Sequence, residues 1–242
     1  MVVLNPKSIV TGPSRTPRWG RTVSIDLGTL DSTLAISRDN RLPRAAVVVT
    51  LAAQELMRLS KAGDKVDNIL VVGTDVDPTR HPGFREVTDN LRALRNKWFP
   101  RAKLNLISND PCLGKSESRI TMGIYDFPVV RMESGTAKTF QKLTGHKSTE
   151  FAEIIKHLTT LERVIIQVCF VRGDADNSTD SEVKGWLKRL KEIEPVEILM
   201  SSPPSRKRKD LPLGVTPSRL KEIVEMITEE VGTKVTEVEY NE

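Results

Sequence analysis

The stretch NILVVGTDVDPTRHPGF, Asn68 to Phe84, shows in miniature the unit from which the chain is built. Its first part, 68–74, is almost continuously apolar, which is typical of a strand buried on both faces of a parallel sheet. The polar loop after it leads into a helical pattern over 82–99, with Pro82 near the first turn, where a helix tolerates proline. The stretch therefore predicts a strand, a loop and a helix in succession.

The same alternation recurs along the chain, giving six strand–helix steps. Such a pattern predicts an α/β fold with a parallel sheet covered by helices. We expect a partial (β/α)6 TIM-like barrel, with a doubly wound open sheet as the alternative. Thr179 and Glu182 predict a capping box for one of the helices. Besides the unit above, we expect strands at 22–28, 103–109, 127–134, 163–173 and 195–202, a further one at 234–240, helices at 45–63, 149–162, 179–193 and 216–232, and an irregular stretch at 114–126.

A single domain over 1–242 is expected, because six such units make one barrel. We interpret residues 1–21 as an N-terminal extension and 201–214 as a long loop after the sixth strand. Residues 215–242 are interpreted as a C-terminal helix that a last strand can follow.

The composition is ordinary for a soluble globular protein, with 38% hydrophobic and 29% charged residues among 242. The longest apolar run, near 45–53, is too short to span a membrane, and the N-terminus lacks the pattern of a signal peptide. Cys112 and Cys169 lie far apart without a CxxC motif, which argues against a disulfide scaffold or a zinc site. We therefore expect a cytoplasmic protein with no membrane partner.

The net charge of +5 is mildly basic and suits an anionic ligand or RNA. The densest basic run, SRKRKD at 205–210, is either a solvated loop or a patch that contacts phosphates. Arg15, Arg18 and Arg21 are further candidates for such contacts. No aromatic residues interleave the basic run, so a stacking platform for single strands is not expected.

Polar side chains follow the predicted strands at their carboxyl ends, where ligands bind in parallel α/β folds. Asp75, Asp77 and His81 could together hold a divalent metal, or they could form a solvated loop in which Asp77 caps a turn. Alternatively, Asp77 could accept a hydrogen bond from a ligand ammonium while Arg131 pairs with a carboxylate. Arg131 could equally form an internal ion pair with Glu133. Neither a Walker loop nor a GxGxxG motif is present.

The segment GPSRTPRWGRTVSIDLGTLDSTLAISRDN, 12–40, resembles the opening segment of the radical S-adenosylmethionine (radical SAM) superfamily, in its short core-domain subgroup. That opening segment is similar to GPVPSRRLGRSLGIDLTPLKTCSFDCVYC. The resemblance continues through VGTDVDPTRHPGF, where Asp77 stands in place of the family's glutamate, then through Asn109, and through RMESG at 131–135. It extends over VCFVRGDADN and WLKRLKEIEPVEI and so covers almost the whole chain. It implies the partial (β/α)6 barrel of that family.

The departures from the family concern its iron–sulfur motif. The three cysteines of CxxxCxxC are replaced by Thr33, Ser37 and Asn40. Cluster iron needs thiolate ligands, which a hydroxyl or an amide cannot replace. A [4Fe–4S] cluster is therefore not expected, and without it the reductive cleavage of SAM has no electron donor. Family glycines in the second motif let the backbone approach the ligand, whereas here Asp75 and Val76 stand beside Asp77 and add charge and bulk.

Several functions stay open. The first is a degenerate, non-redox binding or regulatory protein that keeps a pocket for SAM or a small nucleotide-like ligand and can act with a protein partner. The second is an enzyme of another kind, using Asp75, Asp77, His81 and Glu133 for acid–base or metal-assisted chemistry. The third is an RNA-associated module, and the last is a radical SAM enzyme with an unforeseen cluster arrangement. The resemblance implies Asp77, Asn109, Arg131, Glu133 and Asn177 as the residues that line a cofactor pocket.

Overall fold

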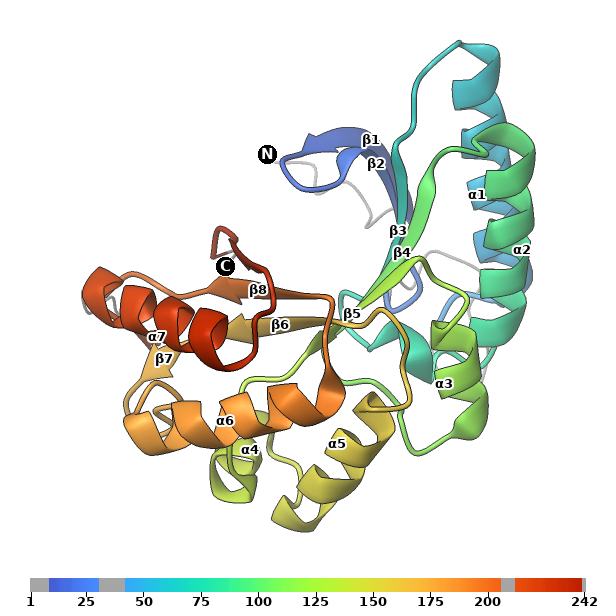
Figure 1. Cartoon of the computed structure of the whole chain (residues 1–242). Coiled ribbons are helices and arrows are strands. Elements are labelled where there is room, and N and C mark those ends of the chain that lie inside the picture. The colour runs from blue at the N-terminus through green and yellow to red at the C-terminus, as the bar shows by residue number, and fades with distance from the viewer. Residues whose placement is uncertain (1–8, 31–41, 206–211, 241–242) are drawn as a thin grey trace, which may run out of the picture. The chain divides into compact units, whose positions relative to one another are not determined.

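The structure is a computed structural model that describes residues 9–30, 42–205 and 212–240 (Figure 1). These residues belong to two compact units, the first ending at Pro128 and the second beginning at Val129. Across the described residues the structure has seven α-helices and a mostly parallel set of strands. The predicted α/β class is thereby confirmed. No helix among these residues is long and apolar enough to cross a membrane.

The first unit contains four strands in the order β1-β2-β3-β4. The ladders joining β2, β3 and β4 are parallel, whereas β1 runs antiparallel to β2. Helices α1 and α2 lie side by side along one face of these strands (Figure 1). The elements are β1 (Val10–Thr16), β2 (Gly20–Asp26), α1 (Ala45–Lys61), β3 (Asn68–Val72), the 3-10 helix η1 (Pro78–Arg80), α2 (Phe84–Trp98), β4 (Lys103–Ser108) and α3 (Ser116–Met122).

One face of this sheet is apolar and forms the core of the first unit. Because paired residues of neighbouring strands share a face, Val23, Ile69 and Leu104 form one buried row across β2, β3 and β4. Helices α1 and α2 are amphipathic and each buries one stripe, which includes Leu56 and Leu91.

The opposite face of the same strands carries a buried polar row near their amino ends. Asn105 donates through Nδ2 to the Oδ1 atom of Asn68 at 2.8 Å, and Asn68 reaches Thr22 Oγ1 at 3.5 Å. The Oδ1 atom of Asn105 accepts from the backbone N–H of Phe127 at 3.1 Å. Buried amides need such partners, so this row explains the presence of the two asparagines in β3 and β4.

The second unit repeats the parallel arrangement in the order β5-β6-β8-β10. Helices α4, α5 and α6 lie on one side of β6 and β8 (Figure 1). Strands β7 and β9 form a separate antiparallel ribbon. The elements are β5 (Phe127–Arg131, which starts in the first unit), α4 (Ala137–Thr144), η2 (Ser148–Glu150), α5 (Phe151–Leu158), β6 (Ile165–Cys169), β7 (Val171–Arg172), α6 (Asp180–Ile193), β8 (Glu197–Ser201), β9 (Leu213–Gly214), α7 (Pro217–Glu230) and β10 (Val235–Glu237).

Several elements were not predicted. Part of the supposed N-terminal extension is strand β1, and the supposed loop 201–214 contains β9. The irregular stretch contains α3, and α4 follows β5 directly. These elements are short or polar, and β1 carries an internal Gly–Pro pair, so none has a clear apolar period.

The helix-start signals are confirmed in part. Thr216 caps α7 with Pro217 in the first turn, and Thr179 Oγ1 accepts from the backbone N–H of Glu182. The second contact of the predicted capping box, in which the Glu182 carboxylate would accept from the backbone N–H of Thr179, is wrong. The Glu182 carboxylate instead accepts from the backbone N–H of Gly135 at 3.1 Å and from Thr136 Oγ1 at 2.7 Å. Glu182 therefore ties α6 to the loop after β5.

Gly135 makes this junction possible, because its α-carbon lies against the backbone of α6. A methyl group there would collide with the carbonyl oxygen of Glu182 and lie 2.5 Å from the Trp186 nitrogen. Neither backbone atom can move without shifting the helix.

We predict that Gly135→Ala lowers the free energy of unfolding by about 1–3 kcal/mol, as overpacking does elsewhere. Urea denaturation is the measurement. Gly114→Ala is the matched control, because nothing lies within 4 Å of its added methyl. Equal stability of the two variants would contradict this account of the junction.

Candidate functional site

The loop after β3 is held close to the end of β2 by glycine. The Val76 carbonyl points at Gly28 and Gly73, where a side chain on either residue would collide with it. In return, the Gly28 carbonyl accepts from the backbone N–H groups of Asp75 at 3.2 Å and Val76 at 3.0 Å. Only glycine permits so close an approach of two backbones.

Asp26 joins the same two strand ends through its carboxylate. Its Oδ1 atom accepts from Gly28 N at 2.8 Å and Thr74 N at 3.1 Å, and Oδ2 accepts from Thr74 Oγ1. Asp26 is 9% exposed. A buried carboxylate with several donors is a structural group, so Asp26 fixes the loop and does not face a ligand.

Asp77 connects this loop to the end of β4. Its carboxylate accepts from the backbone N–H and hydroxyl of Thr79 at 3.0 and 2.6 Å. It also accepts from Ser108 Oγ at 2.8 Å and from the backbone N–H of Asp110 at 2.9 Å. Asp77 caps η1, as one sequence alternative predicted. Both carboxylate oxygens are therefore engaged in shaping the site.

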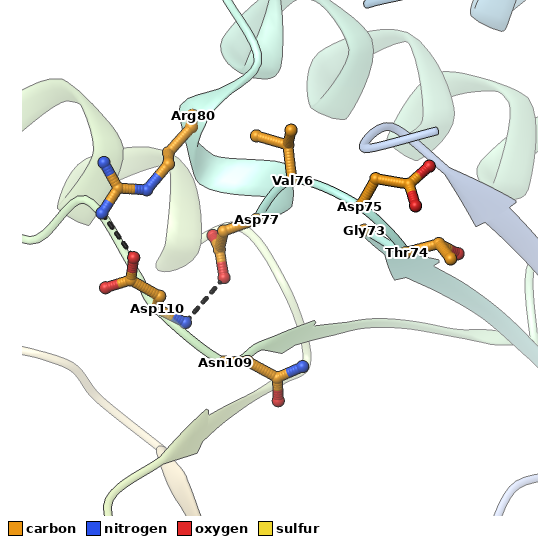
Figure 2. A pocket seen from close by; sticks show the side chains of 8 residues that line it. All are labelled: Gly73, Thr74, Asp75, Val76, Asp77, Arg80, Asn109 and Asp110. Atoms are coloured by element: carbon orange, nitrogen blue, oxygen red, sulfur yellow. Dashed lines mark hydrogen bonds and ion pairs between the residues drawn. The ribbon is translucent and has the colours of Figure 1, made fainter. Parts of the chain in front are cut away.

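A pocket of about 340 Å³ lies at the carboxyl ends of β3 and β4 (Figure 2). Arg80 pairs with Asp110 at 2.6 Å on its rim, and both side chains are more than 40% exposed. The side chain of Asn109 points away from the Asp77–Asp110 contact (Figure 2), and it makes no hydrogen bond to another described residue. The lining residues are Gly73, Thr74, Asp75, Val76, Asp77, Arg80, Asn109 and Asp110.

The charge of this pocket is negative. Three aspartates and one arginine line it, which leaves a formal excess of two negative charges. Because part of its wall is open to solvent, the field is screened but still favours a cationic ligand over a polyanion. The sequence did not point to Arg80 as a pocket residue. Its only indication is its position between Thr79 and His81 in the segment VGTDVDPTRHPGF, which resembles a family motif.

His81 is buried beneath this loop with both ring nitrogens engaged. Nε2 lies 2.7 Å from the Pro43 carbonyl, and Nδ1 accepts from the backbone N–H of Gly83 at 3.0 Å. Nε2 is therefore the protonated nitrogen. Burial lowers the pKa of His81, although the Pro43 carbonyl and Glu86 oppose the shift. This geometry gives His81 a structural role and leaves no nitrogen for metal binding or proton transfer.

The remaining predicted site residues lie in the second unit. Glu133 Oε1 accepts from the backbone N–H of Cys169 at 3.0 Å and pairs with Arg131 Nε at 2.8 Å. Asn177 is 2% exposed and bonds only to backbone, namely the carbonyls of Glu133 and Cys169 and the N–H of Val171. Burial works against the charged form of Arg131, but Glu133 outweighs it, so the pKa of Arg131 is raised.

The residue types present do not fit an iron–sulfur cluster. Thr33, Ser37 and Asn40 lie outside the described residues. The chain has two cysteines, and they belong to different units: Cys112 follows β4, and Cys169 ends β6. Burial raises the pKa of the Cys169 thiol, which disfavours the thiolate that iron requires. Among the described residues no group of three or more His, Cys, Asp and Glu could hold a metal ion.

The arginines named as phosphate contacts lie on the first hairpin. Arg15 on β1 stands opposite Arg21 on β2, and Arg21 pairs with Asp64 at 2.8 Å. The Arg18 guanidinium stacks over the Trp19 ring at 4.4 Å. Most of the basic run at 205–210 lies outside the described residues.

The buried neutral His81 predicts a loss of stability in weak acid. In the unfolded chain His81 takes up a proton below its ordinary pKa of 6.5, whereas the folded state resists protonation. We expect the free energy of unfolding to fall below pH 6.5 by as much as about 1.4 kcal/mol per pH unit from this group. Urea denaturation between pH 5.5 and 7.5 measures the slope. His81→Gln should flatten it, and an unchanged slope in that variant would contradict the assignment.

No family model matches the sequence, and no curated protein matches it. Solved structures do match. SuiB of Streptococcus suis bound to S-adenosylmethionine superposes with a TM-score of 0.55 at 11% identity, over 79% of this chain and 43% of that one. SuiB bound to its precursor peptide SuiA gives 0.56 at 13% identity, over 83% and 44%. A domain of the pyruvate-formate lyase-activating enzyme from Bacteroides vulgatus gives 0.52 at 13% identity, over 68% and 96%.

These neighbours are radical SAM enzymes, and this chain spans less than half the length of SuiB. At such low identity the likeness concerns the fold alone. The predicted fold, a parallel α/β sheet of the radical SAM partial-barrel type, is thereby confirmed. The chain has the fold of the radical SAM enzymes.

Proposed function

We propose that this protein is a non-redox binding protein that holds S-adenosylmethionine, or a similar cationic nucleoside, in the pocket at the ends of β3 and β4. The pocket itself is the observation that carries the proposal. Its volume of about 340 Å³ is within the range of small-molecule sites, which begin near 300 Å³. Its position at the carboxyl ends of parallel strands is where such folds bind ligands.

The chemistry of the pocket supports this class of ligand. SAM carries an ammonium, a sulfonium and one carboxylate, so its net charge is positive and complements the aspartate excess. Asn109 offers an amide donor and acceptor that no described residue uses. The rim pair Arg80–Asp110 is exposed, and exposed pairs are weak enough to exchange partners with a ligand. The matching SuiB structure was solved with SAM bound.

Two assignments follow for the residues that line the pocket. Asn109, Asp75 and the Arg80–Asp110 pair would contact the ligand directly. Asp77 would act indirectly, since its oxygens already hold Thr79, Ser108 and Asp110. A ligand role for Asp77 would require those bonds to break, which costs free energy for each buried donor left unpaired.

The non-redox part of the proposal rests on the residue types at the family's cysteine positions. Thr33, Ser37 and Asn40 supply no thiolate. The bound nucleoside would then serve as a signal, or as a structural ligand that modulates a partner. The acid–base alternative finds no support at His81, whose nitrogens are both engaged.

We predict that the protein binds SAM in calorimetric titration and that Asn109→Ala weakens the binding by about 1 kcal/mol, the usual value of one hydrogen bond. S-adenosylhomocysteine, which lacks the positive sulfonium, should bind more weakly than SAM. Asn90→Ala is the matched control, because Asn90 is also exposed and bonds only within α2. If both variants bind SAM with equal affinity, the assignment of SAM to this pocket is contradicted. If the wild-type protein shows no binding heat with SAM, the proposed class of ligand is contradicted.

We also predict that anaerobic reconstitution of the full chain leaves no stoichiometric iron or acid-labile sulfide after desalting. The measurement is iron and sulfide content together with the absorbance spectrum near 400 nm. About four irons per chain, with a charge-transfer band, would contradict the non-redox reading. Calorimetry with SAM should give the same affinity before and after the reconstitution.

A further inference from the structure

The amino-terminal edge of the first unit's sheet is strongly basic. The starts of β2, β3 and β4 lie side by side there, since Thr22 pairs with Asn68 and Asn68 pairs with Lys103. The loops that join α1 to β3 and α2 to β4 lie at the same end of the unit (Figure 1). We call the segments 15–21, 61–67, 97–103 and 123–126 the basic edge. They contain eight arginines and lysines but only three aspartates, which leaves a formal excess of five positive charges.

The charges of the first unit are thus separated along its strands. The pocket at the carboxyl ends of β3 and β4 carries an excess of two negative charges. The basic edge, at the opposite ends of the same strands, carries a positive excess as large as the net charge of the whole chain, +5. Such a concentration of one sign produces a local field that attracts polyanions.

Ion pairs within the basic edge do not neutralise it. Asp64 pairs with Arg21 at 2.8 Å, and Asp126 pairs with Lys103 at 3.3 Å. Asp67 accepts from the backbone N–H of Arg21 at 2.9 Å. Five exposed cations remain that form no ion pair with a described residue: Arg15, Lys61, Lys65, Lys97 and Arg101.

The fold itself explains only some of these cations. Lys61 and Lys97 belong to the last turns of α1 and α2, where a positive charge complements the helix dipole. Arg15 lies on no helix and stands directly opposite Arg21 in the β1–β2 ladder. Like charges in that position destabilise a strand pair. A bound anion would relieve this repulsion.

Two tryptophans accompany the cations of the basic edge. The Arg18 guanidinium lies 4.4 Å from the centre of the Trp19 ring, and Lys97 Nζ lies 4.9 Å from that of Trp98. Both tryptophans are partly exposed. Nucleic-acid bases stack on aromatic rings and on guanidinium planes. The basic run at 205–210 lacks aromatic residues, whereas PRWGR and KWFPR in the basic edge combine both kinds of side chain.

We propose that the basic edge binds a single-stranded nucleic acid. Arg15 and Arg101 contact its phosphates, while Trp19 and Trp98 stack on its bases. A single strand is required because a duplex keeps its base faces stacked inside. RNA and DNA share the phosphates and the base faces, so the experiment distinguishes between them. The inference does not rest on the proposed function, because the basic edge and the pocket lie at opposite ends of the strands.

The test is fluorescence anisotropy of labelled twelve-nucleotide oligouridylate and oligothymidylate with the full chain, between 50 and 200 mM KCl. We expect saturable binding to at least one strand. The logarithm of the association constant should fall against the logarithm of the salt concentration with a slope of about −2, the value for three phosphate contacts. The tighter of the two strands identifies RNA or DNA as the ligand, and a duplex of the same length should bind more weakly.

Variants separate charge from stacking. Arg15→Gln and Arg101→Gln should each weaken binding about threefold and make the salt slope shallower by about 0.7, as the loss of one phosphate contact does. Lys184→Gln is the matched control, because it removes the same charge from an exposed position on α6 that has no ion pair with a described residue.

The stacking contribution is tested at Trp98. Trp98→Ala should weaken binding about fivefold or more, whereas Trp98→Phe keeps an aromatic face and should stay within about twofold of the wild type. Comparing the two variants excludes a general loss of folding as the cause, provided that circular dichroism shows both to be folded.

The proposal is supported if the arginine variants and Trp98→Ala weaken binding while Lys184→Gln does not. It is overturned if neither strand binds at 50 mM KCl, or if the edge variants bind as well as Lys184→Gln. Polyglutamate of equal charge that displaces the strand as well as unlabelled oligonucleotide does would also overturn it, because the basic edge would then be a site for acidic protein segments.

Discussion

The candidate pocket depends on the carboxylate of Asp77. It joins the loop after β3 to the end of β4 by accepting from Thr79, Ser108 and Asp110. Without Asp77 these donors would have no hydrogen-bond partner at the edge of the sheet. Leaving a buried donor unpaired costs more free energy than a typical hydrogen bond contributes to stability. Gly28 and Gly73 complete the constraint, because only residues without side chains admit the Val76 carbonyl.

The second unit uses the same physical device with other residues. Glu133 and Asn177 accept from or donate to backbone groups at the ends of β5 and β6, as Asp26 and Asp77 do in the first unit. In both units buried or half-buried polar side chains replace missing ladder bonds where parallel strands stop. What differs is the group presented to solvent: an aspartate-rich pocket in one unit, and the Arg131 guanidinium paired with Glu133 in the other.

The prediction of the fold succeeded where burial leaves a clear period. The runs NILVV and IIQVC became β3 and β6, because strands covered by helices are largely apolar. It failed at β1 and α3, which are short or exposed and therefore carry mixed sequences. For the site, position along the chain indicated that Asp77, Asn109, Arg131 and Glu133 follow strands. It could not indicate which of their atoms are already bonded.

The sequence by itself determined the parallel α/β class, the helix starts at Thr179 and Thr216, and the lack of cysteine at positions 33, 37 and 40. These follow from residue type and local spacing alone. Only the tertiary structure decided that Asp77 and His81 are internal partners while Asn109 remains available. The reason is physical: hydrogen-bond partners such as Ser108 for Asp77, or Cys169 for Glu133, are some thirty residues distant in the chain, and only folding brings them within bonding distance.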